Sequence, residues 1–365
     1  MKLLAPNVGW AMSMRRLMWT SSGGSDWRDI TPPNPNDGNI ADIFFLDARH
    51  GWVLLAHGEP DSPSGLQLDL ATTDDSGAAW SVEPCGSNSG VESLTFVDPS
   101  HGWLAFYGGR NSMSSGYGTI QATSDGGRSW GPTNLRNHFH HQSPSGPMLM
   151  ITQQFGWMVA GGDRLYVTRD GAKTWQRIEL ESPVKTDLMR KYDRNFEQFE
   201  SSFQGLPPAA AKLARERAQA EDNSYAAYGL PTFEDSKHGY VCVTYPGVVV
   251  LFATEDGGVT WKPDRVLTGL QEAQTGAVVV SAVVDSTWIT ARVPKNGLPQ
   301  LTKLGPGASA TDSTMPAPEE SGVSQMSFAT ASQGWVLNGV KLLATNDGGA
   351  TWADITPGWP TAASP

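Results

Sequence analysis

At 365 residues the chain is long for one ordinary domain, but a closed repeat fold of this size can form a single unit. Its formal net charge of −11 argues against binding to nucleic acid and against general adhesion to anionic membranes. The two cysteines have neither disulfide-framework nor metal-type spacing, so we expect both to be free, with Cys85 in a connecting loop and Cys242 in a core strand.

An eight-residue phrase, here called the box, returns along the whole chain and is clearest as Thr-Glu-Asp-Gly-Gly-Val-Thr-Trp at residues 254–261. Its glycines supply positive φ and its aspartate can accept backbone N–H bonds, so the box predicts a tight turn between two antiparallel strands. The copies are residues 20–27, 73–80, 123–130, 168–175, 254–261 and 345–352. We assign a structural role to Asp75, Asp125, Asp170, Asp256, Asp347, Trp80, Trp130, Trp175, Trp261 and Trp352, and the copies depart from the pattern at Ser22, Ser76 and Ala172.

A Gly-aromatic pair followed by an apolar strand precedes each box, and most of these pairs follow a strand and a polar turn such as residues 47–50. One unit is therefore four short strands, and its length of roughly 50 residues is the period of a propeller blade. We predict seven blades, at about residues 1–32, 40–84, 91–134, 147–180, 231–266, 276–304 and 323–357. Blade one is expected to lack its first strand and blade six its box, and the last strand should lie beside blade one and close the ring.

The pairing of Asp-x-x-x-Gly-Trp with Thr-x-Asp-Gly-Gly-x-Thr-Trp resembles the Asp-box, or bacterial neuraminidase repeat, propellers. Among these it is most similar to the photosystem II stability and assembly-factor family and its bacterial relatives, over almost the entire chain except about residues 181–230. The resemblance implies an all-β, seven-bladed propeller of four-stranded antiparallel blades that holds a protein or peptide partner, outside the cytoplasm. Because sialidases and xyloglucanases carry the same box, a carbohydrate-binding or glycoside-hydrolysing propeller stays as the alternative.

In propellers with this box, the box turns and the turns between the first two strands of each blade share one face. Here both kinds of turn are short, whereas the long irregular segments fall in the other connections and should emerge on the opposite face. These segments are residues 57–65, 108–118, 132–147, 181–230 and 305–322. Elaboration of one face of a repeat fold is typical of a binding face, although loops also tolerate insertions without a function.

Residues 181–230 are predicted to form a helical hairpin between blades four and five. Aromatic and aliphatic residues recur at helical spacing from Leu188 to Phe203, residues 205–208 break the pattern, and a second helix should follow from Ala209 to about Asp222. We expect the apolar stripe to seat the hairpin on the propeller. The first seven residues lack the apolar run of a signal peptide, and no stretch predicts a transmembrane helix.

No catalytic set can be recognised in the sequence. Residues 138–141 hold the one histidine cluster, without a second cluster to complete a metal site. The acids Asp61, Glu234, Glu272, Glu319 and Glu320 form no recognisable glycosidase pair, and the box carboxylates are expected to be bound in their turns. We therefore expect a monomeric, non-enzymatic protein without a cofactor or metal.

The predicted partner-binding residues come from different insertions that should converge around the central channel. Their cationic and aromatic side chains suit an acidic or aromatic partner surface. They are Arg110, His138, His140, His141, Arg190, Tyr192 and Arg194.

Overall fold

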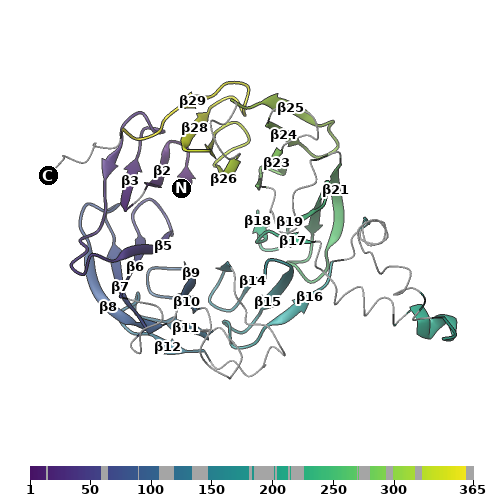
Figure 1. Ribbon diagram of the computed structural model, residues 1–365, viewed down its shortest axis with the longest axis horizontal. Helices are drawn as coiled ribbons and strands as arrows, with labels where there is room; N and C mark the ends of the chain where they lie inside the picture. The colour runs from purple at the N-terminus through teal and green to yellow at the C-terminus, as the bar shows by residue number, and fades with distance from the viewer. Residues whose placement is uncertain are drawn as a thin grey trace.

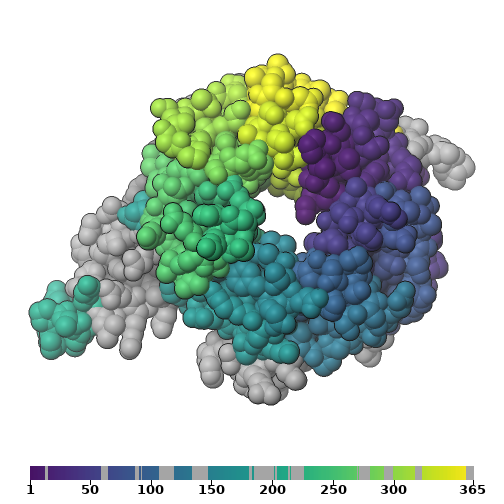
Figure 2. Space-filling model, turned by 180° about the vertical axis from the view of Figure 1, so that it is seen from behind, coloured from purple at the N-terminus to yellow at the C-terminus, as the bar shows by residue number. Residues whose placement is uncertain are grey.

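The computed structural model shows seven antiparallel sheets arranged as the blades of a propeller around a central opening (Figures 1 and 2). The structure describes residues 1–13, 15–58, 65–88, 90–106, 119–133, 147–180, 183–184, 201, 204–212, 214, 226–268, 270, 280–292, 299–316 and 323–358. The predicted all-β, seven-bladed architecture is confirmed.

Each blade runs outward from its first strand to its last, and consecutive strands pair, except in blade five, where β17 and β18 both pair with β19. Blades one to three comprise β1 (Lys2–Ala5), β2 (Val8–Ser13), β3 (Arg16–Thr20) and β4 (Arg28–Asp29); β5 (Asn39–Phe45), β6 (Gly51–His57), β7 (Leu66–Thr73) and β8 (Ser81–Asn88); and β9 (Val91–Phe96), β10 (Gly102–Phe106), β11 (Thr119–Thr123) and β12 (Gly131–Pro132). Blades four and five comprise β13 (Met148–Met150), β14 (Gly156–Ala160), β15 (Arg164–Thr168) and β16 (Gln176–Ile178); and β17 (Ala227–Tyr228), β18 (Thr232–Phe233), β19 (Gly239–Tyr245), β20 (Val248–Thr254) and β21 (Lys262–Thr268). Blades six and seven comprise β22 (Ser281–Val284), β23 (Thr287–Arg292), β24 (Gln300–Leu304) and β25 (Thr311–Thr314); and β26 (Val323–Phe328), β27 (Gly334–Asn338), β28 (Lys341–Thr345) and β29 (Ala353–Asp354).

The core consists of apolar layers between neighbouring blades. The middle strands are covered on both faces, which is why β6 reads Gly-Trp-Val-Leu-Leu-Ala with every one of these residues buried. Between blades two and three, for example, Trp52 stacks on Phe96 with ring centroids 3.9 Å apart, among buried leucines of both blades. The described residues form seven such clusters, one for each junction between blades.

The six boxes share one hydrogen-bond pattern. The threonine Oγ1 accepts the N–H four residues further on, at 2.7 to 3.0 Å. In five copies an aspartate Oδ1 likewise accepts the N–H four residues on, at 2.8 to 2.9 Å. In blade one Ser22 Oγ takes this place and accepts from Asp26 N at 2.9 Å. The box is thus a turn closed by its own side chains.

Three expectations about strands were wrong. Blade one does have a first strand, β1, which pairs with β2 through the turn at Pro6 and Asn7. Blade six begins at Ser281, and its fourth strand, β25, lies within residues 305–322, which were expected to be irregular. The polar Thr311–Thr314 segment forms a strand because it pairs along the edge of β24. Cys85 lies in β8 rather than in a loop, and both cysteines are free.

Blade seven closes the ring against blade one. Leu3 N donates to Ser327 Oγ at 2.9 Å across the inner strands, and Trp27 Nε1 donates to the carbonyl of Ile355 at 2.9 Å nearer the rim. The expected position of the last strand is therefore confirmed. Because the two ends of the chain supply these partners, the junction exists only when the whole ring is assembled.

The predicted helical hairpin lies mostly outside the described residues. Within residues 181–230, residues 208–212 are helical and lie outside the ring of blades, and no hairpin is seen in the part that the structure describes (Figure 1). The hairpin therefore stays a prediction. Nowhere in the described chain does a helix combine the length and the apolar character needed to cross a bilayer.

Candidate functional site

Hydrogen bonds between turns define the two faces of the ring. In each blade with a box, a box N–H donates to a carbonyl of the turn between the first two strands, at 2.8 to 3.1 Å. We call the face formed by these turns the box face. The opposite face, here the loop face, carries the connections from the second strand to the third and from one blade to the next. The long segments 57–65, 108–118 and 132–147 fall in loop-face connections, as predicted. The segment 181–230 does so except at its end, where β17 (Ala227–Tyr228) pairs with β19, so blade five begins at Ala227 and not at residue 231.

The seven predicted partner-binding residues lie outside the described residues. They are Arg110, His138, His140, His141, Arg190, Tyr192 and Arg194. Their convergence around the channel stays a prediction.

The box face consists largely of satisfied turns. His50, His101 and His238 each contact the aspartate three residues earlier, with Nδ1 to carboxylate distances of 2.8, 2.9 and 2.7 Å. All three lie in turns of the box face, directly before the Gly-aromatic pair of their blade. The hydrogen bond and the charge of Asp235 raise the pKa of His238. In the described part of the chain, no group of three or more His, Cys, Asp or Glu side chains could hold a metal ion.

A polar hollow of about 880 Å³ lies on the box face between blades two and three. Trp80, Glu83 and Arg128 contribute to its lining, together with the box residue Asp125. The Asp125 carboxylate already accepts bonds from Ser129 and Thr123, and these bonds lower its pKa to about 2. A carboxylate committed in this way is poorly suited to proton transfer near neutral pH.

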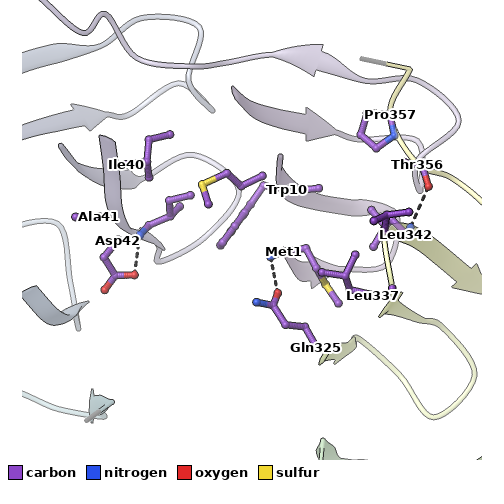
Figure 3. A pocket seen from close by; sticks show the side chains of 15 residues that line it. Met1, Trp10, Ile40, Ala41, Asp42, Gln325, Leu337, Leu342, Thr356 and Pro357 are labelled. Atoms are coloured by element: carbon purple, nitrogen blue, oxygen red, sulfur yellow. Dashed lines mark hydrogen bonds between the residues drawn. The ribbon is translucent and has the colours of Figure 1, made fainter. Parts of the chain in front are cut away.

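The loop face carries a second hollow, of about 380 Å³, where blades seven, one and two meet. We call it the loop-face hollow. Its lining is mostly apolar and comes from the loop-face ends of β2, β5, β27 and β28 and from the segment after β29 (Figure 3). The lining includes Trp10, Met12, Ile40, Asp42, Leu337 and Val340.

Two of these apolar side chains are unusually exposed. Met12 is 43% exposed near the end of β2, and Val340 is 71% exposed in the turn between β27 and β28. Turns of this kind usually carry Gly, Asn or Asp, so the backbone conformation of the turn does not explain why valine occupies this position. Exposed apolar groups at the mouth of an apolar hollow are typical of a contact surface.

Asp42 is the one acid among the described residues that line the loop-face hollow. It follows Ala41, which has no partner in the ladder between β5 and β6, and such a β-bulge re-aims the next side chain. Its Oδ1 accepts Ile43 N at 2.8 Å, and its Oδ2 accepts Leu94 N of blade three at 2.7 Å. Burial raises the pKa of Asp42 despite these bonds.

The sequence alone did not indicate the loop-face hollow. Its lining comes from both ends of the chain, and the turns of blades one and seven that border it are short, whereas the sequence pattern of a binding face is carried by long insertions. The usable signal was Val340, an apolar residue in the two-residue turn that it forms with Gly339 between β27 and β28.

No protein-family model and no curated protein matches the chain. Among solved structures, the chain is similar to a GH74 xyloglucanase from Xanthomonas campestris, at a TM-score of 0.51 and 12% identity over 90% of this chain and 46% of that one. It is also similar to the periplasmic gluconolactonase PpgL of Pseudomonas aeruginosa, at a TM-score of 0.51 and 12% identity over 95% of this chain and 93% of that one. YCF48 bound to a D1 peptide matches with a TM-score of 0.49 and 19% identity over 88% of this chain and 83% of that one. At these identities the likeness is one of fold.

Proposed function

We propose that this chain is a non-enzymatic binding propeller that holds a protein or peptide partner on its loop face. The observation that carries the proposal is the loop-face hollow, with Met12 and Val340 exposed at its mouth. It lies on the face that also receives the long connections. The sequence resemblance to assembly-factor propellers implies the same class of role, and the extracytoplasmic location belongs to the same proposal.

The dimensions of the hollow suit side chains of a peptide. A volume of about 380 Å³ is at the small end of the range for ligand pockets. Burying one aliphatic side chain there would contribute about 1.5–3 kcal/mol. One or two such anchors, with main-chain contacts around them, are enough for a specific but reversible complex.

The test is an array of short random peptides probed with labelled wild-type protein and with two variants. Val340→Glu places a charge at the mouth of the hollow, and Val259→Glu makes the same change in a box, where the valine is 63% exposed on the other face. We expect wild type and Val259→Glu to bind the same peptides. Val340→Glu should lose at least about tenfold in affinity, because burying the new carboxylate without a partner is unfavourable.

The proposal is wrong if no peptide binds, or if the two glutamate variants bind the peptides equally well. A glycan array run in parallel examines the alternative function. Glycan binding that Val340→Glu leaves unchanged, with no peptide binding, would favour a carbohydrate-binding propeller, for which the polar hollow between blades two and three is the place to look.

A further inference from the structure

We infer that the loop-face hollow selects a peptide segment in which an apolar anchor residue lies next to a lysine or arginine, and that Asp42 binds the cationic group. This inference rests on the proposed function and specifies the chemistry of its partner.

The lining of the hollow is asymmetric in charge. Among the described residues that line it, Asp42 is the only side chain with a formal charge. On the opposite wall the Met1 amino group donates to Gln325 Oε1 at 3.0 Å (Figure 3), and burial lowers the pKa of this amine to about 6, so that it is largely uncharged at neutral pH. The chain as a whole carries a net charge of −11. A cationic group is therefore attracted both at long range and at the wall, whereas an acidic segment is repelled.

The two hydrogen bonds of Asp42 leave acceptor capacity unused. A carboxylate offers about four lone-pair sites, and the N–H groups of Ile43 and Leu94 occupy two of them. No salt bridge to Asp42 is found within the described residues. A neutral asparagine or serine could also accept a backbone N–H, so the fold alone does not require a charge here.

An incoming ammonium or guanidinium group offsets the cost of holding this partly buried carboxylate in its ionised form. A cation within about 4–6 Å favours the ionised form of an acid whose burial disfavours it. The aliphatic stem of lysine or arginine can lie along the apolar lining of the hollow while its charged end reaches Asp42. One side chain of the partner can thus satisfy both features of the hollow.

The experiment uses array-selected peptides with a lysine beside the anchor and synthetic copies in which norleucine, which lacks the amine, replaces that lysine. Binding is measured for wild type, Asp42→Asn and the control Asp37→Asn. Asp37 is an exposed acid near the same face that pairs with Arg15 and does not line the hollow. We expect Asp42→Asn and norleucine each to weaken binding roughly tenfold, with little further loss in combination, and Asp37→Asn to bind like wild type.

A salt titration completes the design. The lysine peptide should bind wild type more weakly at high ionic strength, and this dependence should shrink in Asp42→Asn. If the selected peptides show no excess of lysine or arginine, or if Asp42→Asn binds them as tightly as wild type, the inference is wrong while the proposed function stands. If no peptide binds at the loop face, both are wrong. Thermal melts of each variant separate weakened binding from unfolding.

Discussion

The exposed carboxylates of the boxes stabilise their turns through hydrogen bonds rather than through burial. Asp256 accepts bonds from Thr260 Oγ1 at 2.6 Å, from Thr260 N at 2.9 Å and from Thr254 Oγ1 at 2.8 Å. These bonds, with those from Thr260 the largest, lower the pKa of Asp256 from 3.8 to about 2. The side chain is therefore bound in its ionised form.

Acid should weaken this stabilisation. A carboxyl whose folded pKa lies below its unfolded value contributes stability that is fully present above the unfolded pKa, and the contribution is lost as the pH falls through the folded pKa. We therefore expect Asp256→Ala to melt at a lower temperature than wild type at pH 7, and the difference to shrink from about pH 4 towards pH 2. Melting curves against pH check this. A difference that stays constant down to pH 2 would contradict it.

A box glycine has a second role, because it makes room for the neighbouring blade. A Cβ at Gly258 would lie 2.4 Å from the Trp157 ring, and its φ is +80°. Gly162 has a similar φ of +78° but no heavy atom within 4 Å of such a Cβ. We expect Gly258→Ala to destabilise by at least 1 kcal/mol more than Gly162→Ala, because only the former also displaces a buried tryptophan. Urea denaturation of both variants measures the difference, and equal losses would contradict the packing role.

At the scale of elements, blade six shows what replaces a missing box. In the other blades a box N–H satisfies a carbonyl of the turn between the first two strands. In blade six the carbonyl of Ser286 in this turn accepts from Arg265 of the neighbouring blade at 3.2 Å. The same Arg265 nitrogen also donates to the carbonyl of Leu304, and the Ser286 hydroxyl donates to the carboxylate of Glu234. Blade five thus holds the turn that blade six cannot hold itself.

Removal of this guanidinium should loosen blade six. Arg265 is 10% exposed, so Arg265→Met leaves the carbonyls of Ser286 and Leu304 without their hydrogen-bond donor and away from water. The substitution should lower the free energy of unfolding by about 2 kcal/mol. Arg16→Met is the control, since Arg16 is 51% exposed in its pair with Asp29 and should cost under about 1 kcal/mol. Hydrogen exchange should accelerate around residues 285–287 and 300–304 in Arg265→Met alone. Unchanged exchange there would show that Arg265 does not support the turn.

Strands were predictable where they carry a local signal and were missed where only tertiary pairing defines them. The boxes and Gly-aromatic pairs located the middle strands correctly, because turn chemistry and buried apolar runs each depend on a few adjacent residues. Lys2–Ala5 and Thr311–Thr314 have no such signal, and each forms a strand because the adjacent strand offers an unpaired edge. In blade one the sequence shows Ser22 in place of the box aspartate, but only the structure shows that Ser22 Oγ accepts the bond that the aspartate accepts elsewhere.

In the whole molecule, the face on which each connection lies was predictable from the sequence, and the loop-face hollow was not. The order of short and long connections along the chain is enough to assign each to a face. The hollow needs Met12 of blade one and Val340 of blade seven in one lining, which closure of the ring achieves across the junction that Leu3 and Ser327 hold. The predicted site residues lie outside the described residues, so the hollow adds to that prediction and does not replace it.

If a partner binds the loop face, hydrogen–deuterium exchange with and without an array-selected peptide will locate the bound peptide there. Bound peptide should slow exchange at residues 10–13, 39–43 and 337–342, which line or border the hollow. Exchange in the boxes at residues 254–261 and 345–352 should not change. Protection confined to the boxes, or to the polar hollow between blades two and three, would show that the peptide does not bind the loop face.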